Sequence, residues 1–375
     1  MRKSTKSIKT IISVFLVLAV TLNPALADNP QPRKIYSGWL PYYSMKTSLP
    51  AALNNIDLMR EIMPFWYTLK YNGTKASITD LYTPANPSVP ISEPLTAMRN
   101  AGLSIIPTIT DGTDKLVLAG LLKNPTSRTQ IVNAIMNLVR TNNYDGIDLD
   151  FENFAFVDGN TTWPTTAPLW TQFIKELSTA LHSQNKILSI TSPVAFDPAT
   201  GKKGYYVYSW PAISNYIDRL RIMAYDYSVA TAGPIGPINW TEASVSYAAS
   251  VISPSKIYIG IPAYGRDWVT NVSGICPADV AAIIKVGAKA STFVLRDAQN
   301  LAASYGATPT YNDQFAENTF SYQKTYVGTT SAGLATQCTA SRTAWYQDAK
   351  SFTARGNLVM KYQLAGLAQW TLGME

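Results

Sequence analysis

Three carboxylic acids alternate with apolar residues in one short segment of the chain. Residues 144–152 read YDGIDLDFE. In a β-strand alternate side chains share a face, so Asp148, Asp150 and Glu152 point one way and the apolar residues between them point the other way. Neighbouring acids then lie roughly 6.6 Å apart, at about 3.3 Å per residue. Burial and like charge should raise the pKa of at least one of them, which is the property of a general acid.

Two other interpretations of this segment are an edge strand exposed to solvent and a calcium-binding loop. Calcium loops usually place turn-forming residues between their acids. Here Ile147, Leu149 and Phe151 stand between them and favour a strand. A buried strand of acids is therefore the prediction that we follow.

The acids need elements that position them, and the sequence predicts eight strands separated by helical patterns. Helices are expected over residues 127–140 and 168–182, where apolar residues recur on one face. Several strands are almost continuous apolar runs, which is typical of parallel strands covered by helices. This alternation predicts an α/β fold, a (β/α)₈ TIM barrel. The predicted strands are 35–40, 62–68, 103–110, 145–151, 187–193, 219–225, 256–263 and 364–371.

Barrel enzymes place their chemistry at the carboxyl ends of the strands, where Glu152 lies last in its segment. We therefore expect Glu152 to be the general acid, kept protonated by the two acids beneath it.

The interval between the seventh and eighth predicted strands is about a hundred residues long. It contains strand-like pieces around 318–326, a predicted helix at 293–305 and both cysteines of the chain. We predict a small α+β insertion over about 269–340 that forms one wall of the site.

The composition excludes several classes of protein. The net charge of +7 suggests a nucleic-acid or membrane-surface binder, but residues 1–27 combine four basic residues, an apolar stretch and an Ala-x-Ala site. These features predict a secretory signal peptide cleaved before Asp28. The catalytic chain, residues 28–375, then holds 27 basic and 24 acidic residues, so the charge does not predict nucleic-acid binding. No Cys lies near the cleavage site, and no lipid or membrane anchor is expected.

The solitary histidine, His182, excludes a multi-histidine metal site and argues against a histidine-dependent triad. We expect neither metal nor cofactor, and a monomer. Export makes a disulfide between Cys276 and Cys338 plausible, and two separate buried thiols are the alternative.

The acid segment has the form Asp-Gly-x-Asp-x-Asp-x-Glu and resembles the fourth-strand signature of glycoside hydrolase family 18, the chitinase family. Three further segments support the resemblance. Met223-Ala224-Tyr225-Asp226 is similar to the sixth-strand motif of the family, residues 260–265 to its seventh strand, and Trp370 within 369–373 to its eighth-strand tryptophan.

The resemblance implies a secreted glycosidase that cleaves β-linked N-acetylglucosamine glycans with help from the substrate's own acetamido group. Glu152 would protonate the leaving oxygen, Asp150 would orient the acetamido N–H, and Asp148 would share a proton deeper in the barrel. It also implies that Tyr225 binds the acetamido group and Asp226 a sugar hydroxyl.

Aromatic residues are candidates for contact with sugar rings. The resemblance places Trp370 beneath the distorted sugar, whereas ordinary core packing is the alternative for both Trp370 and Tyr225. Trp39 and Trp66 lie on or just after the first two predicted strands and are expected either to line sugar subsites or to be buried.

The chain departs from typical chitinases at the third strand, which lacks Ser-x-Gly-Gly, and at Phe151 and Asn153, where Trp and Tyr are usual. It is closer to the bacterial branch that includes spore-cortex and cell-wall hydrolases. Chitin and peptidoglycan both remain open as substrates, as do endo and exo cleavage. A non-hydrolysing glycan-binding relative is the alternative function, and a structural cell-surface protein is a third. The expected location is extracellular, in the cell wall or in the periplasmic space.

Overall fold

A computed structural model describes residues 35–375 of the chain, so the predicted signal peptide lies outside the described residues. Eight parallel strands form a closed ring, because β1 is paired with β2 on one side and with β15 on the other. The ring follows the order β1-β15-β9-β8-β7-β6-β5-β2. Its strands are β1 (Tyr36–Pro41), β2 (Met59–Tyr71), β5 (Thr108–Asp111), β6 (Gly146–Asp150), β7 (Ile187–Pro193), β8 (Arg219–Met223), β9 (Ile257–Pro262) and β15 (Gly366–Trp370).

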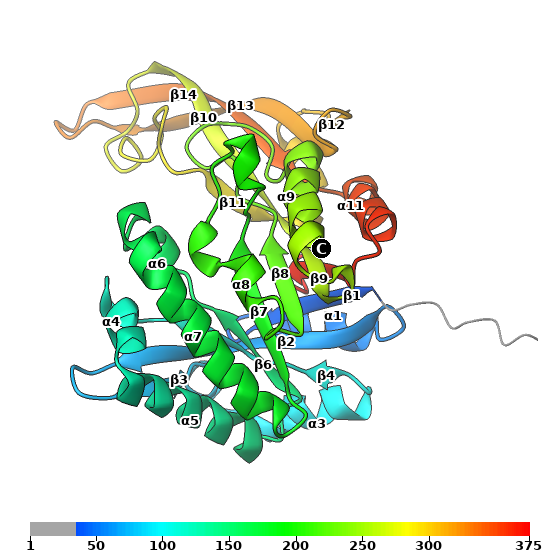
Figure 1. Cartoon of the computed structure of the whole chain (residues 1–375). Coiled ribbons are helices and arrows are strands. Elements are labelled where there is room, and N and C mark those ends of the chain that lie inside the picture. Colours follow the sequence, from blue (N-terminus) through cyan, green and yellow to red (C-terminus); the bar gives the residue numbers. More distant parts are fainter. Residues whose placement is uncertain (1–34) are drawn as a thin grey trace, which may run out of the picture. The chain divides into compact units, whose positions relative to one another are not determined.

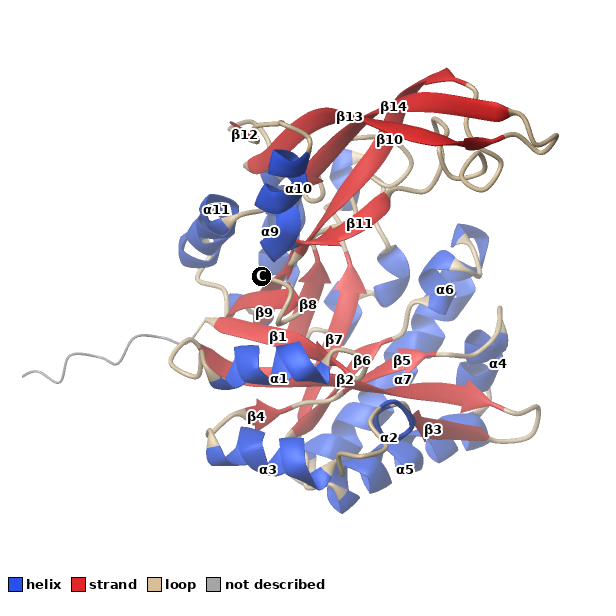
Figure 2. Ribbon diagram, turned by 180° about the vertical axis from the view of Figure 1, so that it is seen from behind, coloured by secondary structure: helices blue, strands red, loops and turns tan. Residues whose placement is uncertain are grey.

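Helices follow the strands and cover the barrel from outside, as Figures 1 and 2 show for α5 and α7. They are α1 (Met45–Leu53), α2 (Tyr82–Ala85), α3 (Ser92–Asn100), α4 (Val117–Lys123), α5 (Pro125–Thr141), α6 (Asn153–Phe156), α7 (Trp163–His182), α8 (Trp210–Ile213), α9 (Ile238–Val251) and α11 (Ala349–Lys361). The predicted (β/α)₈ barrel is confirmed, and each predicted strand overlaps a strand of the ring. No helix within residues 35–375 is long and apolar enough to cross a membrane.

Two elements differ from the prediction. The third strand is divided into β4 (Ser104–Ile105) and β5, because Pro107 has no N–H to give to a neighbouring strand. Its carbonyl still accepts the N–H of Asp148 at 2.9 Å. Helix α7 begins at Trp163, five residues before the predicted start, so that Pro168 lies inside the helix.

The barrel strands separate an apolar outer face from a polar interior. Ile147, Leu149 and Phe151 of the acid segment are fully buried in the core cluster between the strands and the helices. The ring of Phe151 lies 6.2 Å from that of Trp170 on α7. This packing fixes the orientation of β6 and turns its acids toward the inside of the barrel.

A second sheet lies between β9 and β15, at the place where the insertion is predicted. Its strand order is β11-β10-β14-β13-β12, and all of its pairings are antiparallel. Helix α10 (Ala298–Ser304) packs against it through Ala298 and Ala302. The predicted disulfide between Cys276 and Cys338 is present, with 4.7 Å between the Cα atoms. The strands are β10 (Tyr264–Gly274), β11 (Ser291–Val294), β12 (Thr310–Asn312), β13 (Glu317–Thr329) and β14 (Ala335–Tyr346), and Ala76–Asp80 forms β3 at the edge of the barrel sheet.

Candidate active site

The three acids of the β6 segment lie at increasing distance from the barrel interior. Asp148 is completely buried, Asp150 is 7 % exposed, and Glu152 is partly exposed just past the end of the strand. Glu152 immediately precedes α6, so it stands at the carboxyl end of β6. The alternation predicted from the sequence therefore holds along the whole segment.

Polar side chains from the two neighbouring strands, β5 and β7, and from β1 hold the carboxylate of Asp148. Thr108 Oγ1 donates to Oδ2 at 2.9 Å and Ser189 Oγ donates to Oδ1 at 2.5 Å. Thr191 Oγ1 reaches both oxygens at 3.1 and 3.0 Å, and Trp39 Nε1 donates to Oδ2 at 3.4 Å. Hydrogen bonds on both oxygens fix the position of this carboxylate beneath Asp150.

Two arginines, one of them completely buried, lie below Asp148. Arg221 is completely buried, and its Nη1 lies 3.7 Å from Asp148 Oδ1. Its Nη2 binds Glu61 Oε2 at 2.7 Å, and Arg219 binds the other oxygen of Glu61 at 2.6 Å. Burial raises the pKa of Glu61, but the charge of Arg221 and the hydrogen bond from Arg219 lower that pKa below its ordinary value. Directly under the acid segment, the positive charges of the two arginines thus balance the negative charges of Glu61 and Asp148.

Burial raises the pKa values of both upper acids, and their neighbouring charges differ. Burial, followed by the charges of Glu152 and Asp148, raises the pKa of Asp150 well above its ordinary value. Burial also raises the pKa of Glu152, and the charge of Asp226 adds to this rise. The hydrogen bond between Asp150 and Glu152 raises the pKa of Asp150 and lowers that of Glu152.

This corrects the expected cause of the Glu152 shift. We expected the two acids beneath Glu152 to keep it protonated, whereas burial and Asp226 act in that direction and Asp150 acts against it. Asp150 is the more strongly shifted acid because it is buried between two other carboxyl groups.

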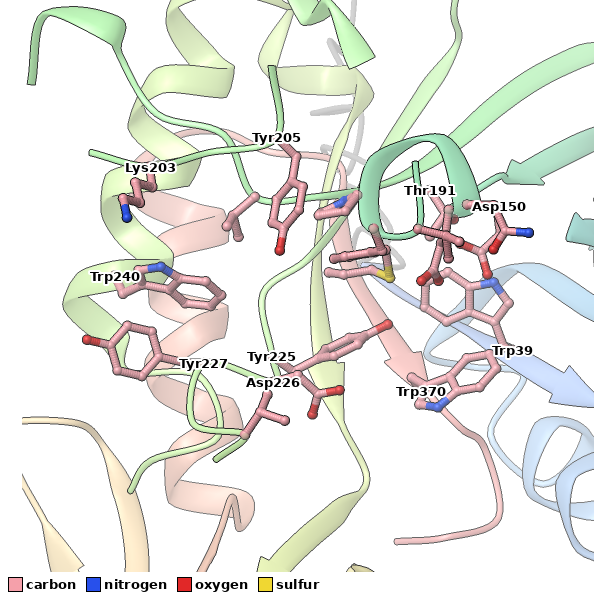
Figure 3. Close-up of a pocket in the computed structure, with 18 of the residues that line it drawn as sticks. Trp39, Asp150, Thr191, Lys203, Tyr205, Tyr225, Asp226, Tyr227, Trp240 and Trp370 are labelled. Carbon is pink, nitrogen blue, oxygen red and sulfur yellow. The ribbon is translucent and has the colours of Figure 1, made fainter. Parts of the chain in front are cut away.

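A cavity of about 790 Å³ opens above Asp150 and Glu152. Figure 3 shows Trp39, Asp150 and Trp370 at one end of this cavity, with Tyr225 and Asp226 near its middle. Asp148 is absent from the lining because it lies in the barrel below Asp150. The predicted site residues that do line the cavity are Trp39, Asp150, Glu152, Met223, Tyr225, Asp226 and Trp370.

Trp39 and Trp370 line the cavity beside Asp150, and Phe65 of a third strand packs against Trp370. The ring of Trp370 on β15 lies edge-on to Phe65 at 4.8 Å and to Trp39 at 5.8 Å. Phe65 on β2 was missed by the sequence analysis, which named Trp66 instead. Trp66 is completely buried in the outer core and its ring lies 4.5 Å from that of Tyr82, so it does not reach the cavity.

The register of β2 explains this error. Side chains alternate between the inside and the outside of the barrel, and Phe65 has the inward parity. An irregularity in the pairing of β2 with β5 falls between Phe65 and Tyr67, next to Trp66. Trp66 is therefore a packing residue, as in the alternative stated above.

Tyr225 and Asp226 follow β8 and reach the cavity from the side of the second sheet. Burial, followed by the charges of Tyr264 and Asp150, raises the pKa of Tyr225 well above its ordinary value, so the phenol remains a hydrogen-bond donor. Asp226 has a φ of 59°, and its Oδ1 accepts from Tyr264 Oη at 2.5 Å and from Arg266 Nη2 at 2.7 Å. Tyr264 and Arg266, both on β10, therefore fix the carboxylate of Asp226, which follows barrel strand β8.

The cavity is also lined by residues that the sequence patterns do not mark, among them Lys203, Tyr205, Tyr227 and Trp240. They lie in loops and at the start of a helix, where no periodic pattern marks a side chain as functional. By contrast, Arg221 could have been found, because Arg219, Arg221 and Met223 share the inward parity of a strand whose other residues are apolar.

Comparison with known proteins agrees with this geometry. The family model described as Glycosyl hydrolases family 18 matches residues 65–375. YdhD of Bacillus subtilis (strain 168), named as a sporulation-specific glycosylase, is 26% identical over 368 residues, which cover 97% of this chain and 74% of that protein.

Solved structures share the fold. A chitinase from Chromobacterium violaceum ATCC 12472 superposes with a TM-score of 0.70 at 23% identity, covering 91% of this chain and 95% of that one. The spore cortex-lytic enzyme SleL of Bacillus megaterium QM B1551 gives a TM-score of 0.71 at 18% identity, covering 92% of this chain and 72% of that one. With its barrel, its acid segment and the match over residues 65–375, the chain belongs to glycosyl hydrolases family 18 and is a glycosidase.

Proposed function

We propose that the protein is a secreted glycosidase that cleaves β-linked glycans containing N-acetylglucosamine, with Glu152 as the general acid. The observation that carries the proposal is the placement of Glu152 at the cavity, with a raised pKa, next to the buried carboxyl group of Asp150. A carboxylic acid that keeps its proton toward neutral pH can protonate a leaving glycosidic oxygen.

The other carboxyl groups of the cavity favour a mechanism that is assisted by the substrate. A retaining glycosidase with a protein nucleophile needs a second, ionised carboxylate about 5–5.5 Å from the acid. The raised pKa of Asp150 opposes its ionisation, and Oδ1 of Asp226 is engaged by Tyr264 and Arg266. The substrate's acetamido oxygen is the nucleophile that remains.

In the proposed reaction the acetamido oxygen forms a bond to the anomeric carbon while the glycosidic bond breaks and Glu152 gives its proton to the leaving oxygen. Asp150 then accepts the acetamido N–H and opposes the positive charge of the cyclic intermediate, as its own proton passes toward Asp148. Water, deprotonated by Glu152, opens this intermediate with net retention of configuration.

Other residues of the cavity would hold the sugar. Tyr225 donates its phenolic hydrogen to the acetamido group and Asp226 accepts a sugar hydroxyl. Trp370 and Trp39 provide an apolar surface beneath the ring, and Met223, which also lines the cavity, is a further contact for the substrate.

The relatives support a substrate in a cell wall or in chitin, and the predicted signal peptide supports secretion. The test is to incubate the chain from Asp28 with chitin oligosaccharides and with purified cell-wall glycan, and to identify products by mass and by the anomeric configuration in early NMR spectra. We expect products with N-acetylglucosamine at the new reducing end and retained β configuration. Inverted products would refute the substrate-assisted mechanism, and glycan binding without turnover would refute hydrolysis.

A further inference from the structure

The end of the cavity away from Trp370 is basic and aromatic rather than acidic. Figure 3 shows Lys203, Trp240 and Tyr227 together at this end, with Tyr225 and Asp226 between them and Trp370. A second cavity of about 420 Å³ shares these three residues with the first, so the two cavities adjoin each other. Its other lining residues are Phe196, Lys202, Pro237, Asn239 and Phe315.

Two consecutive lysines, Lys202 and Lys203, provide the positive charge of this region. Both side chains are exposed, and within residues 35–375 neither ammonium group forms an ion pair. Tyr206 Oη donates to the Lys202 carbonyl at 2.6 Å and closes the loop that carries them. The carboxylate of Asp197 in the same loop accepts the N–H of Ala199 at 2.9 Å. The two charges are thus presented to solvent at the cavity, and no carboxylate of the described residues pairs with them.

Fixed aromatic rings lie beside these lysines. The ring of Trp240 lies 5.3 Å from Tyr227 and 6.4 Å from Phe196. Phe196 is 2 % exposed and Lys202 Nζ lies 5.6 Å from its ring, so the lysine stem covers a rigid surface. Aromatic faces of this kind stack on sugar rings, and ammonium groups next to them attract an anion.

We propose that this region, formed by Lys202, Lys203, Tyr227 and Trp240 and here called the lysine subsite, binds a sugar that carries a carboxylate. The sugar that fits is an N-acetylated hexosamine with an O-linked lactyl group, the acidic unit that alternates with N-acetylglucosamine in peptidoglycan. Chitin carries no carboxylate, so it cannot use the two ammonium groups. This inference rests on the proposed function and narrows its substrate from chitin or peptidoglycan to peptidoglycan.

The experiment compares kcat/KM on four tetrasaccharides of equal length. They are a chitin tetramer, a peptide-free peptidoglycan tetramer, the same tetramer with its lactyl carboxylates reduced to alcohols, and a peptidoglycan tetramer with its peptides attached. The variants are Lys202→Met/Lys203→Met, which keeps the apolar stems, and Lys202→Arg/Lys203→Arg, which keeps the charge. Lys123→Met, an exposed lysine at the end of α4, is the matched control.

We expect the ratio of kcat/KM for the peptide-free acidic tetramer to that for the chitin tetramer to fall about tenfold in the double methionine variant, as for a lost charge-assisted contact. The arginine variant should retain most of the ratio, and the control should leave it unchanged. For the wild-type protein, the tetramer with reduced carboxylates should give a similarly lowered ratio of kcat/KM to that for the chitin tetramer. If the methionine variant lowers this ratio only for the peptidoglycan tetramer with attached peptides, the lysines recognise a carboxylate of the peptide.

A ratio that stays within about twofold of the wild type on both acidic glycans would overturn the lysine subsite while leaving hydrolysis intact. If neither glycan is cleaved, the proposed function fails, and calorimetric binding of the acidic and reduced tetramers to the wild type decides the inference separately. Equal affinity for the two tetramers would then contradict it.

Discussion

At the residue scale, the buried guanidinium of Arg221 determines how charge is arranged under the acid segment. It contacts Glu61 and Ser189 directly and lies 3.7 Å from Asp148, and its plane is 5.0 Å from the ring of Tyr258. A cation in this position opposes the accumulation of negative charge from three stacked acids. Arg221 thus balances the charge of Glu61, whose pKa it lowers, beneath the acid segment and without touching the cavity.

Replacing Arg221 by Met should destabilise the protein by about 3–5 kcal/mol, because two buried carboxylates lose a shared partner. The melting temperature should fall by about 5 °C or more, measured by circular dichroism. Arg140→Met, which removes an exposed arginine from the last turn of α5, serves as the control and should change stability by less than about 0.5 kcal/mol. Equal melting temperatures of the two variants would contradict the role of Arg221.

The pH dependence of the reaction should respond to Asp226. The negative charge of Asp226 raises the pKa of Glu152, so Asp226→Asn should lower that pKa and leave Arg266 without its carboxylate partner. Glu152 then loses its proton at a lower pH, and the basic limb of the kcat/KM profile moves to lower pH.

The control for this pH measurement is Asp313→Asn, at an exposed acid that pairs with Lys350 outside the cavity. Its pH profile should match that of the wild type. A basic limb that stays in place or moves to higher pH in Asp226→Asn would show that Asp226 does not act on the general acid.

At the scale of single elements, strand parity predicted the acids of the site, and on β2 the same parity places Phe65 inside the barrel and Trp66 outside it. The β6 acids follow strict alternation, and Tyr225 follows β8 with the inward parity. The β2 irregularity beside Trp66 has no mark in the sequence, because Phe65 and Trp66 are both large aromatics. The ring contact of Phe65 with Trp370 and the burial of Trp66 against Tyr82 show which of the two turns inward.

Strand β9 makes space for Tyr225 through Gly260. A Cβ atom at Gly260 would lie 3.0 Å from Tyr225 Cε1 and would collide with the carbonyl oxygen of Ile222. Gly260→Ala should therefore displace β8 or Tyr225, destabilise the barrel by about 1–3 kcal/mol and reduce kcat/KM.

Gly120→Ala is a matched control for Gly260→Ala. Gly120 lies in α4, and a Cβ atom there meets nothing within 4 Å, so this change should preserve activity and stability. Melting curves and kcat/KM of both variants make the comparison. Wild-type values for Gly260→Ala would mean that the close approach does not constrain Tyr225.

At the scale of the whole molecule, the sequence predicted the barrel and the insertion because eight apolar strand patterns and one long interval are visible in it. The acidic end of the cavity was predictable for the same reason, since its residues end regular strands. The lysine subsite was not, because Lys203 and Trp240 are 37 positions apart in sequence and only the fold brings them together. The hydrogen bonds from Tyr264 and Arg266 to Asp226 also required the second sheet.

Glu152 is proposed as the general acid of this barrel, and the substitution Glu152→Gln removes the proton on which that role depends. The amide keeps the size of the side chain but has no proton to give to the leaving oxygen. We predict that kcat on the glycan that the wild type cleaves falls at least about a hundredfold, with glycan affinity and melting temperature close to those of the wild type. A Glu152→Gln protein that hydrolyses the same glycan at the wild-type rate would contradict the account.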